Sequence, residues 1–151
     1  MKQLSIIVGI AGGLWLALVL VYQAVAIGDV VSARQKTEAF FKAIQAQKYD
    51  EAEKLFAGAV DVSQKISLEE SFKLLSYDNV RADFDDGCVC TGNAALTFEV
   101  DEKPLEVHAI VTFSSEGMPQ QVCAVHPPGA ERGFIAELRA WNRMFCGGGS
   151  F

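Results

Sequence analysis

The hydrophobic pattern begins with a 24-residue run, from Leu4 to Ile27, that contains no charged residue. A helix rises 1.5 Å per residue, so a helix over this run is about 36 Å long and can cross a hydrocarbon core of about 30 Å with some tilt. Its thirteen Leu, Ile and Val residues favour insertion by about 4 to 8 kcal/mol before Gln23 and the glycines are counted. Residues 1–27 are therefore predicted to form a short tail and a transmembrane helix.

A cleaved secretory signal is the alternative reading of this run. Lys2 could serve as its basic region, and Ala24-Val25-Ala26 has the small-x-small form of a cleavage site. The apolar region of a signal is 7 to 15 residues long, however, and this run is much longer. We expect a retained anchor.

The pattern after the anchor changes from helical to strand-like periodicity. Helices are expected from Val30 to Gln47, from an N-cap at Asp50 to Gly58, and from a capping box of Ser67 and Glu70 that precedes Phe72, Leu74 and Leu75. Alternating apolar positions from 80 to 84 and strands near 94–100, 105–113 and 119–126, with turns at Asp101–Pro104 and Ser114–Gly117, predict an antiparallel meander.

Helices followed by a curved antiparallel sheet define an α+β class. A last helix is expected over 130–145, where Phe134, Leu138, Trp141 and Phe145 share one stripe. We divide the chain into the anchor (1–27), a juxtamembrane connection (28–36), an α+β domain (37–146) and a glycine-rich flexible tail (147–151).

The helix, elbow and second helix resemble those of NTF2-like and cystatin-like α+β domains. The residues that carry this resemblance are Ala39-Phe40-Phe41-Lys42-Ala43-Ile44-Gln45-Ala46-Gln47-Lys48-Tyr49-Asp50-Glu51-Ala52, followed by strand hairpins. The chain departs from these families where their last strand often carries a Trp-Lys-Ile type segment, because 117–125 reads Gly-Met-Pro-Gln-Gln-Val-Cys-Ala-Val. One anchor with an NTF2-like domain is similar to inner-membrane components of bacterial secretion systems and to transport-associated membrane proteins, which implies a scaffold role.

Four cysteines, Cys88, Cys90, Cys123 and Cys146, all follow the anchor. An even number suits disulfides and an oxidising compartment, so we expect the domain outside the cytoplasm, in a bacterial periplasm. Three pairings are open; cysteines two residues apart rarely bond each other, so we expect Cys88 and Cys90 to reach separately to Cys123 and Cys146. Without Lys2, 12 basic and 19 acidic residues leave a formal charge of about −7, which disfavours nucleic acid as a partner.

Candidate chemistry elsewhere is weak. Asp83, Asp85 and Asp86 could attract a cation, but no later glutamate completes a calcium loop. His108 and His126 could each act as a base, yet no motif places a nucleophile or an acid beside them. We expect no cofactor, no metal site and no catalysis.

The anchor itself carries the clearest functional signal. Ser5, Gly9, Gly13 and Ala17 recur every fourth residue and form a stripe of small side chains along one helix face. Such a stripe lets another helix approach closely in lipid. The sequence therefore predicts a non-catalytic accessory or assembly subunit that joins integral membrane proteins in a larger complex. The alternative is a membrane-tethered module that binds a small apolar ligand or peptide beneath the sheet.

Overall fold

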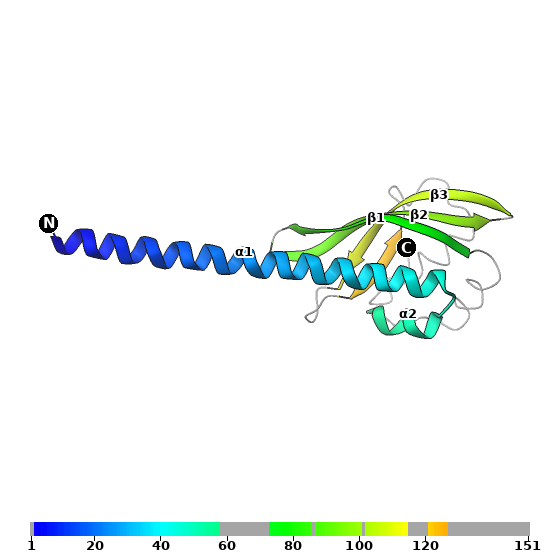
Figure 1. Ribbon diagram of the computed structural model, residues 1–151, viewed down its shortest axis with the longest axis horizontal. Coiled ribbons are helices and arrows are strands. Elements are labelled where there is room, and N and C mark those ends of the chain that lie inside the picture. The colour runs from blue at the N-terminus through cyan, green and yellow to red at the C-terminus, as the bar shows by residue number, and fades with distance from the viewer. Residues whose placement is uncertain (1, 58–72, 86, 101, 115–120, 127–151) are drawn as a thin grey trace.

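The computed structural model describes residues 2–57, 73–85, 87–100, 102–114 and 121–126 (Figure 1). In chain order they form helices α1 (Lys2–Gln45) and α2 (Tyr49–Leu55), then strands β1 (Lys73–Asp85), β2 (Cys88–Val100), β3 (Lys103–Phe113) and β4 (Val122–His126). The predicted α+β class is confirmed. The helix expected over 130–145, the tail and Cys146 lie outside the described residues.

Helix α1 is one continuous helix that contains the apolar run and also contributes side chains to the core of the domain. Gly28 and Asp29 interrupt the apolar pattern without ending the helix, although glycine costs about 1 kcal/mol in a helix interior. Figure 1 shows the N-terminal half projecting beyond the sheet and the other half lying along it. We attribute the continuity to this second half, whose packing against the sheet holds residues beyond Gly28 in helical geometry.

The elbow after α1 is a Schellman turn. Lys48 N–H donates to the Ala43 carbonyl oxygen (2.9 Å) and Gln47 N–H to that of Ile44 (2.9 Å), while Gln47 takes a left-handed φ of 56°. The Lys48 carbonyl oxygen then accepts the N–H groups of the next helix, so α2 begins at Tyr49 with Lys48 as N-cap and no side-chain cap. The prediction of Asp50 as N-cap was wrong by two residues.

The four strands form an antiparallel meander in the order β1-β2-β3-β4, as predicted. The first hairpin was only partly predicted, since β1 begins at Lys73 and β2 at Cys88. Leu74 and Leu75, expected on a helix, belong to β1, where Leu74 pairs with Phe98 and is 2% exposed. Burial against the neighbouring strand outweighs the local helical signal there; positions 67 to 72 lie outside the described residues.

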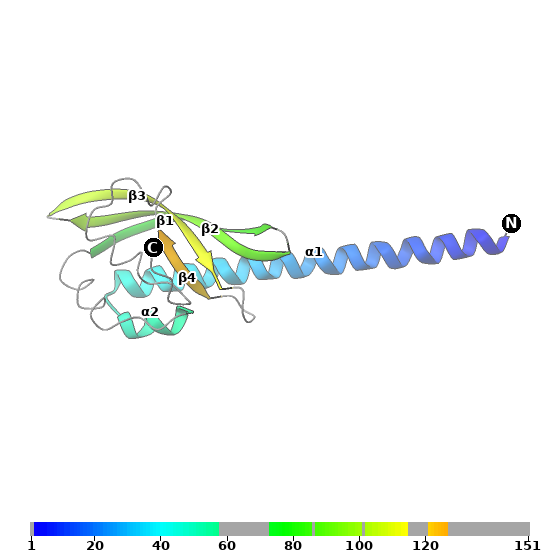
Figure 2. The same ribbon diagram turned by 180° about the vertical axis from the view of Figure 1, so that it is seen from behind.

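The core lies between α1 and one face of the sheet (Figure 2). Phe40 stacks on Phe56 with ring centroids 5.9 Å apart, and Phe41 contacts Tyr77 at 5.7 Å. These rings tie α1 to the end of α2 and to β1. The largest side chains that are less than 2% exposed are Phe40, Phe41, Phe98, Leu74, Val89, Val111, Val122 and Thr37.

Strands β1 and β2 approach each other closely at Gly92. A Cβ atom there would overlap the carbonyl oxygen of Arg81 and lie 3.1 Å from Ala82 Cα. We predict that Gly92→Ala lowers the free energy of unfolding by about 1 to 3 kcal/mol, because the strand backbones must separate. Thermal unfolding in mild detergent measures the loss.

Gly28→Ala is the matched control for this substitution. A Cβ at Gly28 meets nothing within 4 Å, and alanine is the better helix former by up to about 1 kcal/mol. Gly28→Ala should therefore leave the melting temperature unchanged or raise it. An unchanged melting temperature for Gly92→Ala would contradict the close approach.

Candidate functional site

The exposed half of α1 is apolar on every side. The stretch Gly9–Gln45 is long enough and apolar enough to cross a membrane, and its most apolar 18-residue window has a mean hydropathy of 2.1. Trp15 is 68% exposed. The other exposed large apolar side chains before residue 28 are Ile10, Leu14, Leu16, Leu18, Leu20, Val21, Tyr22, Val25 and Ile27. In water such a surface would be unfavourable, so this half of the helix requires lipid or another apolar surface around it.

Gly9, Gly13 and Ala17 of the predicted stripe all lie on this exposed stretch. A Cβ added at Gly9 or Gly13 would meet nothing within 4 Å. The described part of the chain therefore leaves these glycines open to a neighbour. Ser5 is helical, but its side chain is outside what the structure describes.

At Cys90 the buried positions of strand β2 switch from odd-numbered to even-numbered residues. Thr91 pairs with Asp83 and Val89 pairs with Phe84, so two steps along β2 match one step along β1. Cys90 is the extra residue of a β-bulge. In consequence Val89 turns inward and is 1% exposed. Regular alternation would have buried the two flanking cysteines instead, as their phase had suggested.

The bulge brings Cys88 and Cys90 together in a disulfide with a Cα separation of 5.5 Å. Two residues of a regular strand span about 6.6 Å, near the upper end of the disulfide range of about 4.4 to 6.8 Å. The expected separate links to Cys123 and Cys146 are therefore wrong for this pair. Cys123 is also disulfide-bonded.

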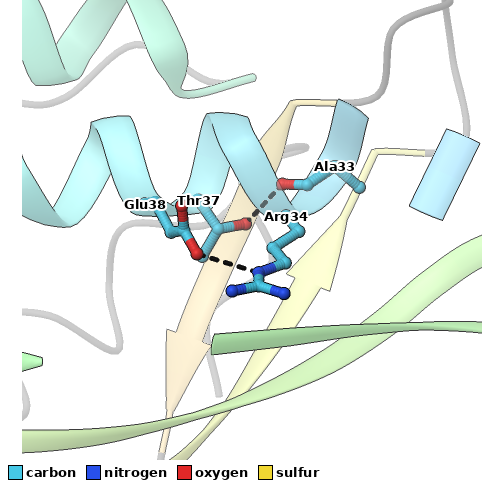
Figure 3. A network of polar contacts seen from close by, with 4 residues as sticks. All are labelled: Ala33, Arg34, Thr37 and Glu38. Carbon is cyan, nitrogen blue, oxygen red and sulfur yellow. Dashed lines mark hydrogen bonds and ion pairs between the residues drawn. The ribbon is translucent and has the colours of Figure 1, made fainter. Parts of the chain in front are cut away.

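A polar pocket lies beside α1, which the sequence had not indicated. The Arg34 Nε–H donates to Glu38 Oε1 at 2.8 Å, four residues further along the helix (Figure 3). Beneath this pair the buried Thr37 hydroxyl donates to the Ala33 carbonyl oxygen at 2.8 Å. The pocket has a volume of about 380 Å³ and is lined by Arg34, Glu38, Tyr77, Asp78, Asn79, Val80 and Arg81.

The pocket depends on an irregular stretch of β1. Asn79 has a left-handed φ of 54°, and the pairing with β2 shifts between Asp78 and Arg81. The four charged residues of the lining carry two positive and two negative charges, so they give no net attraction for a charged ligand. Only the spacing of Arg34 and Glu38 could have hinted at this place, because the other wall comes from a strand about forty residues away.

The remaining candidates stay apart. His108 is exposed on β3, and the backbone of His126 pairs with Ile110 in β4. Asp83 is exposed and accepts a hydrogen bond from the Asn93 side-chain amide at 3.3 Å. Asp86 lies outside the described residues. Among residues 2–57 and the described strands, no group of three His, Cys, Asp or Glu side chains could hold a metal ion.

No protein-family model, no curated protein and no solved structure matches this chain. The resemblance to NTF2-like and cystatin-like domains therefore remains a prediction from the residues.

We predict that disulfide mapping finds the short Cys88–Cys90 link. Cleavage after Glu99 separates these cysteines from Cys123. The peptide with both residues should be two hydrogen masses lighter than its dithiol form and free of any link to the peptide of Cys123. Recovery of a cross-linked pair of peptides would contradict the structure.

The same link should contribute little to stability. Chain-entropy loss in the unfolded state grows with loop length, and so short a loop gives about 1.5 kcal/mol against about 2 to 4 kcal/mol for ordinary disulfides. The Cys88→Ser/Cys90→Ser double variant should lose about that amount in denaturant unfolding.

Proposed function

We propose that this chain is a non-catalytic accessory or assembly subunit of a larger membrane complex. It spans a bacterial inner membrane once and presents an NTF2-like or cystatin-like α+β domain in the periplasm. The observation that carries the proposal is the continuity of α1 from the exposed apolar stretch to the domain core. A tether for an independent enzyme or binding module only has to be long enough. A helix shared with the core, in contrast, fixes the domain rigidly to its anchor.

The direction of the small-residue stripe supports this role. Twenty residues separate Gly13 from Ala33, and 27 separate it from Phe40; at 3.6 residues per turn both lie roughly 180° to 200° around the helix. Ala33 and Phe40 are 1% exposed and belong to the core. The stripe therefore faces away from the side that the sheet covers, so a second helix could pack on it without meeting the domain.

The filled core favours docking over ligand capture. The alternative module requires an apolar cavity beneath the sheet. Aromatic and branched side chains occupy the described space between α1 and the sheet, and the pocket beside Arg34 is lined mainly by polar and charged side chains. The extracytoplasmic location rests on the Cys88–Cys90 disulfide and on Cys123, since disulfides persist in oxidising compartments.

The test is recovery of the intact chain in mild detergent, with identification of the proteins that accompany it. We predict stoichiometric integral membrane partners for the unmodified chain and their loss with Gly9→Ile/Gly13→Ile. Isoleucine side chains would keep the helices apart. Because a Cβ at these glycines meets nothing in the described chain, the domain should melt at an unchanged temperature.

Leu14→Ile/Leu18→Ile provides the matched control. Both leucines are exposed and lie roughly 100° and 140° around the helix from Gly13, off the small-residue stripe, so partner recovery should be unaffected. Equal recovery with the glycine double variant would exclude the stripe as the contact. A chain recovered alone, with a small bound molecule, would favour the binding module.

A further inference from the structure

The β1–β2 end of the sheet lies against a part of α1 that belongs to the apolar run. The ring of Phe84, next to the end of β1, contacts the ring of Tyr22 edge to face, with centroids 5.8 Å apart and planes at 79°. One turn further along, Ala26 is 8% exposed. Figure 1 shows this end of the sheet reaching back over the middle of α1. Tyr22 and Ala26 both fall within the run that predicts the membrane helix.

The length of the helix places Tyr22 at a membrane boundary. Counted from Leu4, a hydrocarbon core of about 30 Å is crossed after about twenty residues, near Ala24. Tyrosine is enriched at this level, where its ring meets acyl chains and its hydroxyl meets water. The apolar run alone would have placed the end of the hydrocarbon core at Ile27.

The sheet sets the same limit independently. Asp83 and Asp85 flank Phe84 and are exposed. Neither their carboxylates nor an open sheet edge can enter hydrocarbon, because unsatisfied polar groups there cost several kcal/mol each. The hydrocarbon must therefore end at about the level where Phe84 meets Tyr22, which agrees with the limit from helix length.

We propose that the β1–β2 end of the sheet rests in the lipid headgroup layer of the membrane that α1 crosses. Phe84 and Tyr22 lie at the edge of the hydrocarbon, and Asp83 and Asp85 lie among the headgroups. This layer is about 5 to 7 Å thick on each side of the bilayer. The inference goes beyond the accessory role and does not depend on it.

The exposed charges at this end identify the kind of lipid. Both carboxylates are negative, and the domain as a whole carries a formal charge of about −7. Anionic headgroups would repel this surface, whereas zwitterionic phospholipids offer it a choline or ammonium group. The surface is therefore suited to a zwitterionic leaflet.

Depth-dependent quenching of tryptophan in the full-length chain tests the proposal. The chain is reconstituted in phosphatidylcholine vesicles whose acyl chains carry bromine at a shallow or a deep position. In a Trp15→Phe/Trp141→Phe background, Phe84→Trp reports the depth of the β1–β2 end. Leu75→Trp is the control at the other end of β1, where the Leu75 carbonyl oxygen accepts a hydrogen bond from the Gln45 side chain. Trp15 alone, with Trp141→Phe, reports the anchor.

Phe84→Trp should lose more fluorescence to shallow bromine than to deep bromine, while Leu75→Trp should lose none. Trp15 should be quenched most by deep bromine. Tyr22→Trp in the same background should match Phe84→Trp, which guards against misfolding of one variant.

Three results would overturn the proposal. Phe84→Trp and Tyr22→Trp unquenched beside a quenched Trp15 would place the domain clear of the bilayer. Stronger quenching by deep bromine would place the contact inside the hydrocarbon. Absence of quenching at Trp15 as well would mean that α1 does not cross the bilayer. Because the vesicles contain no other protein, failure of the accessory role would leave all these results unchanged.

Discussion

The packing of the second half of α1 against the sheet is the interaction on which the rest of the structure depends. Phe40 and Phe41 are at most 1% exposed and join the helix to α2 and β1. They hold helical geometry through Gln45, so the apolar stretch and the domain share one backbone. Without this packing, α1 would be an anchor followed by a separate helix, and Gly28 would be a natural hinge.

Two different surfaces along one helix follow from this arrangement. Between Ile10 and Val21 most of the large apolar side chains are exposed and point to different sides of the helix, as suits lipid. From Ala26 to Ile44 one stripe is buried, while Arg34 and Glu38 form an ion pair on another side. The transition occurs where Tyr22 meets Phe84. A single helix can carry both patterns because each stretch needs only the side chains that suit its own surroundings. A stretch in lipid is apolar on all sides, whereas a stretch on a sheet needs one apolar stripe.

Features with local causes were predictable from the sequence, and those with long-range causes were not. The meander, with Leu96 and Phe98 buried on β2, follows from alternation. Leu74 and Leu75 were misassigned because a nearby capping pattern suggested helix, whereas pairing with a distant strand decides their conformation.

The same contrast applies to the candidate site. The stripe of Gly9 and Gly13 is visible as a spacing of four residues. The pairing of Cys88 with Cys90 requires a bulge that regular alternation does not reveal, and no local signal connects Tyr22 with a phenylalanine 62 residues later.

A continuous helix also sets two coordinates at once. Each residue adds about 1.5 Å of height and about 100° of rotation, so the depth of Tyr22 in the membrane fixes the height of the sheet. The direction of Gly13 likewise fixes the side that the domain presents to a neighbouring helix. A partner that packs on the glycines is therefore held at one height along the domain and on the side of α1 opposite the sheet. A flexible linker at Gly28 would release both constraints, and the helix there is unbroken.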